Sequence, residues 1–536
     1  MANLSTMDAT FLYNETPETP MHVAGLAIFK PRDDYDGNIF EDYRKFIADR
    51  VHLISYLHRR LSTSAFAPFD PIWIEDYDLD WDYHIRHNAL PKPGNRKQLN
   101  ELVERLHAVP LDRKRPLWQF YVIEGLEEGG FALFTKTHHA CLDGGAGIVT
   151  MNILYDQSPD GSEVAPPNLH GQTRQPEPDW VQHLRESYSQ LLKQQVKMLE
   201  NAPQMLKAME QLTHKAVDDI LHPKVPKTAP RTPINVSIGR ERSFSTLSLP
   251  LSEVKALAKA TGYKINDVVM MLSGGALRRY LERLGDLPAE PLIGGVPASL
   301  RKAGDFKMNN QVVLMLASLA TTERDPIERL KAVSESMTEA KERLALVKDV
   351  IHLEYSYIGA PQIMQGWTRF MNATHAADQL PPPMNVIVSN VPGAPSPWYL
   401  LGHEMANYFP VSIPNNGVGL NITAQSYRDT LDIGIVSGKA AVQQTDTISE
   451  MFLQEYALFK KRVAAMEAPT DKAETPAVEV PIRKAPSKNA ATKARTSDPA
   501  LQKTAAKKSG AKNPAVKPKA TRKSAPRQPA TKPKKA

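Results

Sequence analysis

The stretch FALFTKTHHACLDGG occupies Phe131–Gly145 and joins an apolar half to a polar half. The apolar half predicts a strand over Phe131–Thr137, and the run WQFYVI predicts another over Trp118–Ile123, with a glycine-containing turn between them. Apolar residues over Ile148–Leu154 favour a helix that begins after the glycines. The polar residues are therefore expected in a turn between a strand and a helix, where side chains can face a cleft while the sheet holds them.

This turn contains the groups that general base catalysis requires. The neutral ring of a histidine at the end of the strand can accept a hydroxyl proton near neutral pH, because the ordinary pKa of histidine is about 6.5. Asp143 can orient that ring, or it can pair with a cation and hold the shape of the turn. Gly144 and the glycine after it permit backbone angles and close approaches that other residues forbid. The spacing alone does not distinguish such a site from a solvated turn.

Two rival interpretations involve other residues of the turn. Cys141 could act as a thiolate nucleophile, but no cation other than a histidine is evident beside it, so a packed and unreactive thiol is favoured. His138 and His139 are adjacent and project in different directions, and no third ligand follows at a suitable spacing. We therefore expect no metal site here.

The length and composition of the chain limit its architecture. A chain of 536 residues exceeds the size at which one hydrophobic core keeps growing, so two domains are expected. The single cysteine, Cys141, excludes an internal disulfide and fits a reducing compartment. The first residues lack a basic region followed by an apolar core, so no secretory signal is expected, and apolar runs such as Val312–Ala320 are shorter than the roughly 20 residues that span a bilayer.

Composition divides the chain into four parts. Residues 1–155 and 241–466 mix helix and strand patterns, residues 156–240 are expected to form linkers and a helical crossover, and residues 467–536 are expected to be a disordered tail. Further helices are predicted at Phe40–Leu61, Lys97–His107, Ser252–Ala260, Ile265–Leu284 and Thr447–Val463. Further strands are predicted at Phe244–Leu249, Pro291–Ala298, Gln311–Ser318, Met384–Val391, Leu420–Tyr427 and Leu431–Ser437.

The segment between the two α/β parts has a helical pattern of its own. Trp180–His222 shows apolar residues at helical spacing, interrupted by a proline. Two interpretations remain open: the helices pack on the body and bridge the domains, or they touch lipid, with Lys193, Lys197 and Lys207 nearby. The first is favoured, because such faces usually belong to a core.

The C-terminal tail is strongly basic, although the body before it is acidic. Ala468–Ala536 contains 18 Lys plus Arg and 4 Asp plus Glu, which leaves 48 basic and 55 acidic residues in the body. The tail has no aromatic residue and consists mainly of Lys, Ala, Pro, Thr and Ser, so it cannot bury enough apolar area to fold. It is expected either to bind a polyanion, such as anionic lipid or nucleic acid, or to act only as a solubilising extension.

Several segments resemble a known family. HHACLDGG fits the HHxxxDG motif of acyl-CoA-dependent acyltransferases with the chloramphenicol acetyltransferase-like fold, and LSTMDATFLYNETPETPMHVAGLAIF is similar to the start of the bacterial wax ester synthase/diacylglycerol acyltransferase family. Other similar segments are Pro116–Trp118 (PLW), the Asn266–Asp267 pair, VPASLR ending at Arg301, Ser389–Gly393 within VSNVPG, and GLNITAQSYRDTLDIGIV. The chain departs from the family at Met308, Asn309 and Asn310, where Gly-Asn is usual, and the tail lies outside the resemblance.

The resemblance implies roles for the residues of the motif. His139 would be the general base, and His138 would shape the site. Asp143 would give structural support by pairing with Arg301, and Gly144 would belong to the motif backbone.

Each of the other residues in the similar segments has two possible roles. Asn266 and Asp267 either act near the acyl or oxyanion region or cap the helix that follows. Ser389 and Asn390 either line a channel or form a turn at the end of a strand, and Trp118 is favoured as an apolar anchor.

The fold and activity of the family are then expected here. The fold would be α/β, with two chloramphenicol acetyltransferase-like sandwich domains joined by a helical crossover and an active-site channel at their interface. The reaction would be acyl transfer from fatty acyl-CoA to a long-chain alcohol, giving a wax ester, or to diacylglycerol, giving triacylglycerol. No metal or redox cofactor is expected, since acyl-CoA is a substrate.

We also expect a cellular location for the protein, and two alternative functions remain open. A cytoplasmic enzyme is expected, associated peripherally with the inner membrane and with lipid inclusions. The alternatives are another acyl or condensation transferase of the same fold, and a non-catalytic lipid-granule tether that acts through the basic tail. The sequence predicts neither the preferred acceptor nor the oligomeric state.

Overall fold

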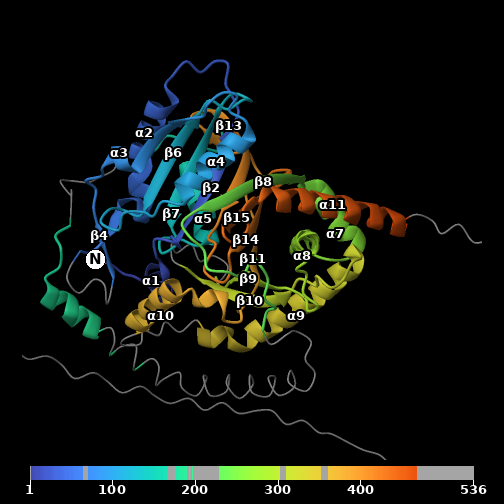
Figure 1. Cartoon of the computed structure of the whole chain (residues 1–536). Coiled ribbons are helices and arrows are strands. Elements are labelled where there is room, and N and C mark those ends of the chain that lie inside the picture. The colour runs from blue at the N-terminus through green and yellow to red at the C-terminus, as the bar shows by residue number, and fades with distance from the viewer. Residues whose placement is uncertain are drawn as a thin grey trace, which may run out of the picture. The chain divides into compact units, whose positions relative to one another are not determined.

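Two six-stranded β-sheets with helices packed on them form an α/β fold (Figure 1). The computed structural model describes residues 2–63, 71–165, 175–189, 192, 196, 228–301, 310–351 and 360–467. The predicted tail, most of the predicted helices of Trp180–His222, and Met308 and Asn309 lie outside the described residues. Among the helices of the described part, none is both long and apolar enough to cross a membrane.

The first sheet contains the strand that ends in the two histidines. Its order is β12-β13-β2-β7-β6-β5, and only the pair β5 and β6 is parallel. Helices α2 and α5 pack on one face, and α4 packs on the other together with β8 and β15 of the second sheet. The elements are α1 (Thr6–Asn14), β2 (His22–Phe29), α2 (Ile39–Arg50), α3 (Trp81–His84), β5 (Ile85–Ala89), α4 (Arg96–His107), β6 (Trp118–Glu124), β7 (Phe131–His138), α5 (Gly144–Leu154), β12 (Tyr399–Leu400) and β13 (His403–Val411).

The second sheet has the order β10-β9-β11-β14-β15-β8 and carries the largest hydrophobic core. Helix α8 lies in the middle of this core, and its side chains from Val268 to Leu272 are fully buried. The elements are β8 (Arg242–Pro250), α7 (Leu251–Thr261), α8 (Ile265–Leu284), β9 (Ile293–Ser299), β10 (Val312–Ser318), α9 (Pro326–Ile351), α10 (Ala360–Thr374), β11 (Val386–Val391), β14 (Leu420–Tyr427), β15 (Thr430–Gly438) and α11 (Asp446–Glu467).

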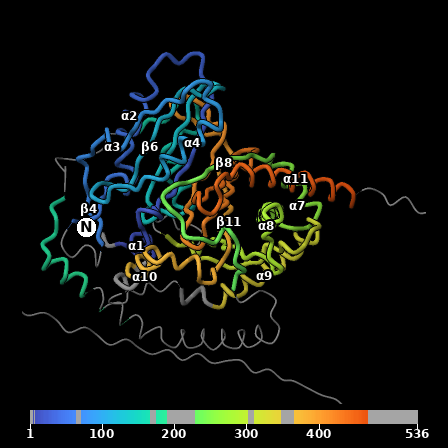
Figure 2. Tube along the Cα trace, in the orientation of Figure 1, coloured from blue at the N-terminus to red at the C-terminus, as the bar shows by residue number. Residues whose placement is uncertain are grey.

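Strand β13 connects the two parts of the molecule. Although it comes from the C-terminal half, it pairs with β2, and Phe409 lies opposite Leu26. The trace in Figure 2 shows this orange segment among the blue and cyan strands of the N-terminal half. The sheets therefore do not follow the sequence-based division at residues 155 and 241, because 399–411 belongs to the first sheet.

Most predicted elements are present, and one predicted helix is wrong over half its length. The strands of the motif region and helices α4, α7, α8 and α11 lie within one to four residues of the predicted bounds. The helix predicted at Phe40–Leu61 ends at Arg50, and two 3-10 turns lead to β3 (Arg59–Leu61). There the backbone pairs with β4 (Ile72–Glu75), in a small sheet that also contains β1 (Ala2–Asn3), so tertiary pairing overrides the helical pattern.

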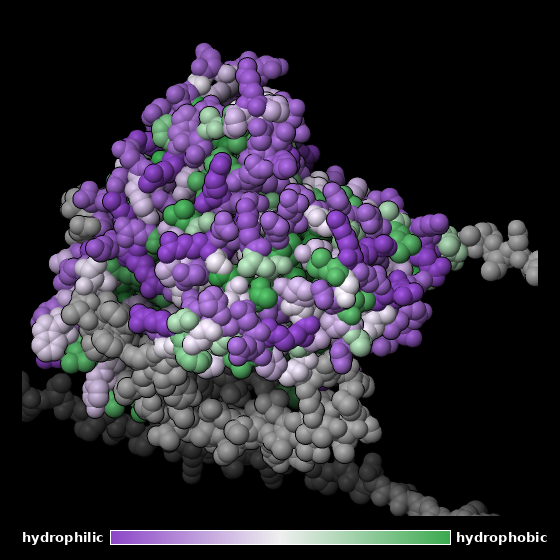
Figure 3. Space-filling model, viewed as in Figure 1, coloured by the Kyte–Doolittle hydropathy of each residue, from purple (hydrophilic) through white to green (hydrophobic). Residues whose placement is uncertain are grey.

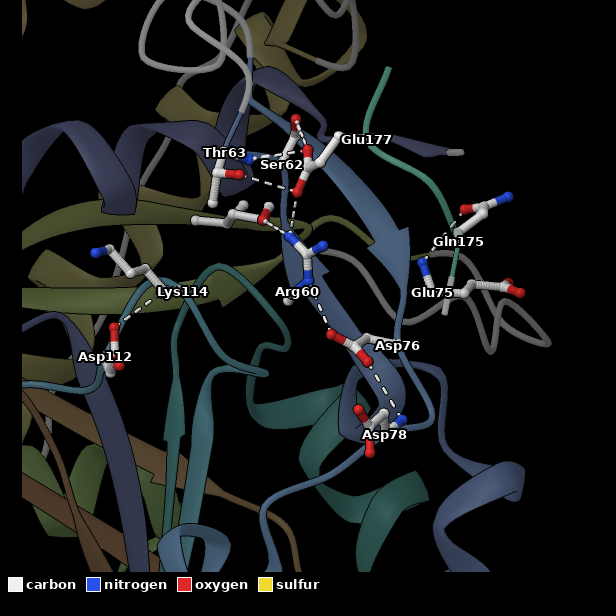
Figure 4. A network of polar contacts seen from close by, with 11 residues as sticks. Arg60, Ser62, Thr63, Glu75, Asp76, Asp78, Asp112, Lys114, Gln175 and Glu177 are labelled. Atoms are coloured by element: carbon white, nitrogen blue, oxygen red, sulfur yellow. Dashed lines mark hydrogen bonds and ion pairs between the residues drawn. The ribbon is translucent and has the colours of Figure 1, made fainter. Parts of the chain in front are cut away.

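The first part of the predicted linker region 156–240, residues 156–178, is attached to the body at both of its described ends. Asp156 is buried and lies 3.3 Å from Arg50. At the other end, Glu177 accepts hydrogen bonds from Arg60 at 2.6 Å and from the Ser62 hydroxyl at 2.8 Å (Figure 4). The helical residues 180–189 follow directly, so their start is anchored by a carboxylate held by several donors.

Candidate active site

Backbone hydrogen bonds hold the two histidines at the end of β7. His138 is the last residue of this strand, and its N–H donates to the carbonyl of Leu117 at 2.9 Å. The N–H of His139 donates to the carbonyl of Met21 at 2.8 Å. Because Leu117 and Met21 directly precede β6 and β2, the neighbouring strands on both sides fix the path of the chain through the motif.

Asp143 begins helix α5 and joins the two halves of the chain. Its Oδ1 accepts from the Ala146 N–H at 2.8 Å, as an N-cap does, and its Oδ2 accepts from the Gln311 N–H at 2.9 Å. Arg301, two residues after β9, places Nη2 3.1 Å from both carboxylate oxygens, and the two side chains are 13% and 1% exposed. The expected ion pair is therefore formed, and Asp143 holds the turn and does not contact the ring of His139 directly.

The two glycines of the motif have ordinary helical backbone angles. Helix α5 begins at Gly144, four residues earlier than predicted, and neither glycine has a positive φ. A Cβ on Gly144 would lie 3.5 Å from Val391, which is an ordinary contact. A Cβ on Gly145 would lie 3.3 Å from both Arg301 Nε and Asp143 Oδ1. Close approach to the ion pair is thus the constraint, and it acts at Gly145.

The ring of His139 lies between a residue near the start of the chain and one from its second half. It stacks on Phe11 of α1 with the ring centroids 4.0 Å apart and the planes 5° from parallel. Its Nδ1 is 2.9 Å from Oδ1 of Asn310, which directly precedes Gln311 and β10. His139 remains partly exposed, so the site is at the junction of the two halves and is accessible from outside.

The surroundings of His139 favour the neutral ring. Burial lowers the pKa of His139 below its usual value of 6.5. Hydrogen bonds to its own carbonyl and to Asn310, and the charge of Asp143, oppose this effect in part. A histidine that acts as a general base must be neutral before the reaction, and these surroundings provide that state near neutral pH.

His138 has different surroundings. It is fully buried, and its Nδ1 accepts a hydrogen bond from the Ala140 N–H at 3.0 Å. Its Nε2 lies 3.4 Å from Oε1 of Glu15, whose other oxygen accepts from Arg113 Nε at 2.8 Å. Burial by itself would raise the pKa of Glu15, but His138 and Arg113 lower it to about 2. His138 therefore lies beside a buried, ionised carboxylate.

Cys141 is also buried, in the core beneath the first sheet. Burial raises the pKa of its thiol far above the usual value. A thiol without a stabilised thiolate is a poor nucleophile, in agreement with its interpretation as a packing residue.

The Asn266–Asp267 pair lies in the first turn of α8, in the second half of the molecule. Asp267 is buried and accepts from the Lys264 N–H at 3.4 Å and from the Ser334 hydroxyl at 3.2 Å. It therefore caps its helix and contacts α9. For Asn266, no side-chain hydrogen bond to His139 or to the motif turn is found among the described residues.

Ser389 and Asn390 lie near the end of β11, where they pair with Thr423 and Ala424 of β14. Both are half-buried, and the next residue, Val391, faces the start of α5. Ser389 and Asn390 are thus close in sequence to Val391, which lies near Gly144 of the motif turn. Trp118 is fully buried and donates from its indole N–H to the carbonyl of Leu57 at 2.9 Å, as an apolar anchor would.

A cavity of about 550 Å³ lies between α1 and α10, next to the Glu15 and Arg113 contact. Its lining includes Leu12, Glu15, Arg113, Thr368, Arg369 and Asn372. His139 is not part of the lining, so a channel that reaches His139 stays a prediction. Within the described residues there is no group of three or more His, Cys, Asp or Glu side chains suited to a metal ion.

Sequence reasoning missed Asn310 and its support by Asp8. The Oδ1 of Asp8 accepts from the Asn310 backbone N–H at 2.9 Å and from its Nδ2 at 2.7 Å. Both residues stand in segments that were singled out, but only as points of likeness or departure. Their contacts span 302 positions, and no local pattern reports such a pairing.

Comparison with known proteins identifies the family of the chain. Residues 4–269 match the model of the wax ester synthase/diacylglycerol acyltransferase catalytic domain, and residues 308–460 match that of the WS/DGAT C-terminal domain. A putative diacylglycerol O-acyltransferase of Mycobacterium tuberculosis (strain H37Rv) is 35% identical over 449 residues, which are 83% of this chain and 96% of the relative. The O-acyltransferase WSD of Acinetobacter baylyi is 31% identical over 480 residues, or 87% and 99% of the two chains.

Solved structures show the same fold. The wax ester synthase/diacylglycerol acyltransferase from Marinobacter aquaeolei VT8 is 27% identical, with a TM-score of 0.60 over 86% of this chain and all of the other. The starter condensation domain of rhizomide synthetase, solved with C8-CoA and Leu-SNAC, is 11% identical, with a TM-score of 0.53 over 86% of this chain and 94% of the other. This second likeness concerns the fold alone. From the family models and the relatives together, the chain belongs to the wax ester synthase/diacylglycerol acyltransferase family.

Proposed function

We propose that this acyltransferase moves a fatty acyl group from acyl-CoA to the hydroxyl of a long-chain alcohol or a diacylglycerol, with His139 as the general base. The observation that carries the proposal is the position of His139. It is the partly exposed histidine of the motif, it lies where the two halves meet, and the pKa of its ring is lowered by burial. The matching family model is named for wax ester synthase and for diacylglycerol acyltransferase, and a relative is named as a putative diacylglycerol O-acyltransferase.

In this proposal the proton follows a closed path. The ring nitrogen of His139 takes the hydroxyl proton while the oxygen attacks the thioester carbonyl and forms a tetrahedral oxyanion. Collapse of the oxyanion breaks the carbon–sulfur bond and releases coenzyme A thiolate. The same ring returns the proton to sulfur, so the products are the ester and coenzyme A with a free thiol. General base catalysis of this kind supplies typically about 10²- to 10⁴-fold in rate.

The other residues support this step indirectly. Asp143 and Arg301 hold the start of α5 against the connection between β9 and β10, which keeps the motif turn beside Asn310. The buried Cys141, whose thiol has a raised pKa, gives no support to an acyl-enzyme route. The proposed reaction needs no metal or redox cofactor, since every bond that forms or breaks belongs to the two substrates or to the transferred proton.

The test is release of coenzyme A from palmitoyl-CoA, measured with hexadecanol and with diacylglycerol as separate acceptors. Wild type is expected to release the free thiol only when an acceptor is present, and to form the matching ester. His139→Ala, in protein that remains folded, is expected to lose this release. Acceptor-dependent release that persists in His139→Ala would reject the assignment of the base. Folded wild type that releases no thiol with either acceptor would reject the activity.

We also propose that the protein binds to membrane and lipid-inclusion surfaces from one side. Exposed apolar residues occur at helical spacing at positions 180, 184 and 188, where Trp180 and Tyr188 are 58% and 60% exposed. Most of the surface seen in Figure 3 is hydrophilic. Ala468–Ala536, with its excess of basic residues, would add attraction to anionic lipid. Flotation with neutral and anionic vesicles, for the full chain and for a chain ending at Glu467, tests both contributions separately.

A further inference from the structure

The side-chain amide of Asn310 has one orientation that satisfies its neighbours. Its Nδ2 is 2.7 Å from Asp8 Oδ1 and 2.7 Å from the carbonyl of His139. Both partners are acceptors, so they use the two hydrogens of Nδ2. Flipping the amide would place its oxygen against a carboxylate oxygen and a carbonyl oxygen. The Asn310 oxygen must therefore face the ring of His139.

This orientation determines the tautomer of the histidine. The Asn310 oxygen, 2.9 Å from Nδ1, has lone pairs and no hydrogen, so a hydrogen bond there requires a proton on Nδ1. In the neutral ring the lone pair is then on Nε2. Stacking on Phe11 fixes the plane of the ring, so the direction of that lone pair is fixed as well.

We infer that Asn310, held by Asp8, is a positioning residue that keeps His139 in the tautomer whose Nε2 accepts the proton. The inference rests on the proposed role of His139 as the base. Asn310 lies in the second half of the molecule, just before β10, and Asp8 lies on α1, so the competent base forms only when these distant segments are together. Among the described residues, the other charged or titratable groups near the ring are His138 on β7, Asp143 at the start of α5, and Arg301 after β9.

Substitution of Asn310 tests this role. Asn310→Leu has a similar size and no acceptor, and is expected to lower kcat by about 10²-fold while KM changes by about 3-fold or less, because the ring loses its fixed tautomer and orientation. Asn310→Asp keeps an acceptor at Nδ1 and adds a negative charge. It is expected to retain more activity than Asn310→Leu and to move the acid limb of the kcat/KM profile to higher pH.

A double variant and a control separate positioning from folding. Asn310→Asp places two carboxylates together, so combining it with Asp8→Asn, which supplies an amide donor, is expected to recover activity while the acid limb stays at higher pH. Asn235, a buried asparagine that donates to main-chain carbonyls outside the site, serves as the control. Asn235→Leu is expected to lower thermal stability without moving the acid limb.

The tautomer itself is measured without reference to activity. The ¹⁵N shifts of the His139 ring in the full chain, assigned by their loss in His139→Gln, are expected to show a protonated Nδ1 and an unprotonated Nε2. Asn310→Leu is expected to change this pattern. A wild-type ring protonated at Nε2 would overturn the inference even if the enzyme is active. Equal losses in Asn310→Leu and Asn310→Asp with an unmoved acid limb would overturn it too, whereas failure of acyl transfer in wild type would count against the proposed function alone.

Discussion

His138 and His139 are neighbours in the chain, but opposite arrangements surround their rings. The Nδ1 of His138 accepts from the Ala140 N–H, so its lone pair is used inside the fold and its Nε2 faces the carboxylate of Glu15. The Nδ1 of His139 faces an acceptor, the oxygen of Asn310. The lone pair on Nδ1 of His138 therefore accepts a backbone hydrogen bond inside the fold. The ring of His139 keeps the lone pair on Nε2 available for a substrate.

The difference shows that the partner of a ring nitrogen decides what a histidine can do. A buried histidine that receives a backbone N–H and contacts a carboxylate stabilises the turn. A partly exposed histidine with Nδ1 occupied by an acceptor has the arrangement of a general base. The motif contains both, and the structural histidine fixes the strand end from which the other projects.

The largest expected effect comes from substituting each histidine by glutamine. His139→Gln removes the base and is expected to lower kcat by about 10²- to 10⁴-fold with little loss of thermal stability. His138→Gln is expected to lower kcat by about 10-fold or less, but to lower the free energy of unfolding by about 1 to 3 kcal/mol, because the Ala140 N–H loses its buried acceptor. Steady-state kinetics and urea unfolding of both variants measure these effects. Equal losses of kcat in the two variants would remove the distinction between the rings.

The sequence alone predicts the site residues that stand within motifs, but not the residues that hold His139 from a distance. His139, Asp143 and Arg301 stand within motifs, and the ion pair between the last two was expected and is formed. The roles of Asn310 and Asp8 were not predicted, because they come from a contact between the start of the chain and its second half.

Prediction of the fold from the sequence has the same limit. Strands β6 and β7 have strong alternating or apolar patterns and were predicted closely. Strand β13 was missed, as was its place in the first sheet, because pairing between distant strands is not encoded in either local pattern. The helix predicted to run to Leu61 was wrong for a similar reason, since pairing with β4 decides the structure of Arg59–Leu61.

The second prediction concerns the ion pair between Asp143 and Arg301, which holds the motif turn. Arg301→Met leaves the buried carboxylate of Asp143 without its cation and is expected to lower the free energy of unfolding by about 3 kcal/mol. Activity should fall as well, because the motif turn then keeps the hydrogen bond from the Gln311 N–H to Asp143 but loses the ion pair among its links to the segment that carries Asn310. Arg44→Met is the control: its partner Asp82 is 84% exposed, so a change of about 0.5 kcal/mol or less is expected. Urea unfolding of both variants gives the two values, and similar values would mean that the buried pair contributes no more than the surface pair.

The third prediction concerns the carboxylate beside His138. His138 and Arg113 lower the pKa of Glu15 to about 2 despite burial, so the ionised group stabilises the fold above its usual pKa of 4.5, and this contribution is lost as the pH falls towards 2. Glu15→Gln is expected to lower the free energy of unfolding by about 2 kcal/mol at neutral pH. The difference from wild type should shrink below about pH 4.5.

Urea unfolding at several pH values measures this change. Glu101→Gln, on the exposed side of α4, is the control and should show little difference at any pH. A difference between wild type and Glu15→Gln that stays constant as the pH falls below 4.5 would show that the carboxylate stabilises by shape and not by charge.

The smallest expected effect is a shift in pH dependence, and it separates the two rings most directly. Burial lowers the pKa of His139, so the ring stays neutral to lower pH than an exposed histidine does. Protonation of Nε2 removes the acceptor, so kcat/KM should be constant near neutral pH and fall as the pH drops through that lowered pKa. The midpoint is therefore expected below about 6.5, in a profile measured from about pH 5 to about pH 8. His138 is a minor contributor to the lowered pKa of His139, so His138→Gln should leave the midpoint unchanged or raise it slightly. A midpoint above the usual histidine value in wild type, or a large shift in His138→Gln, would mean that the two rings titrate together and that the base is not His139 acting alone.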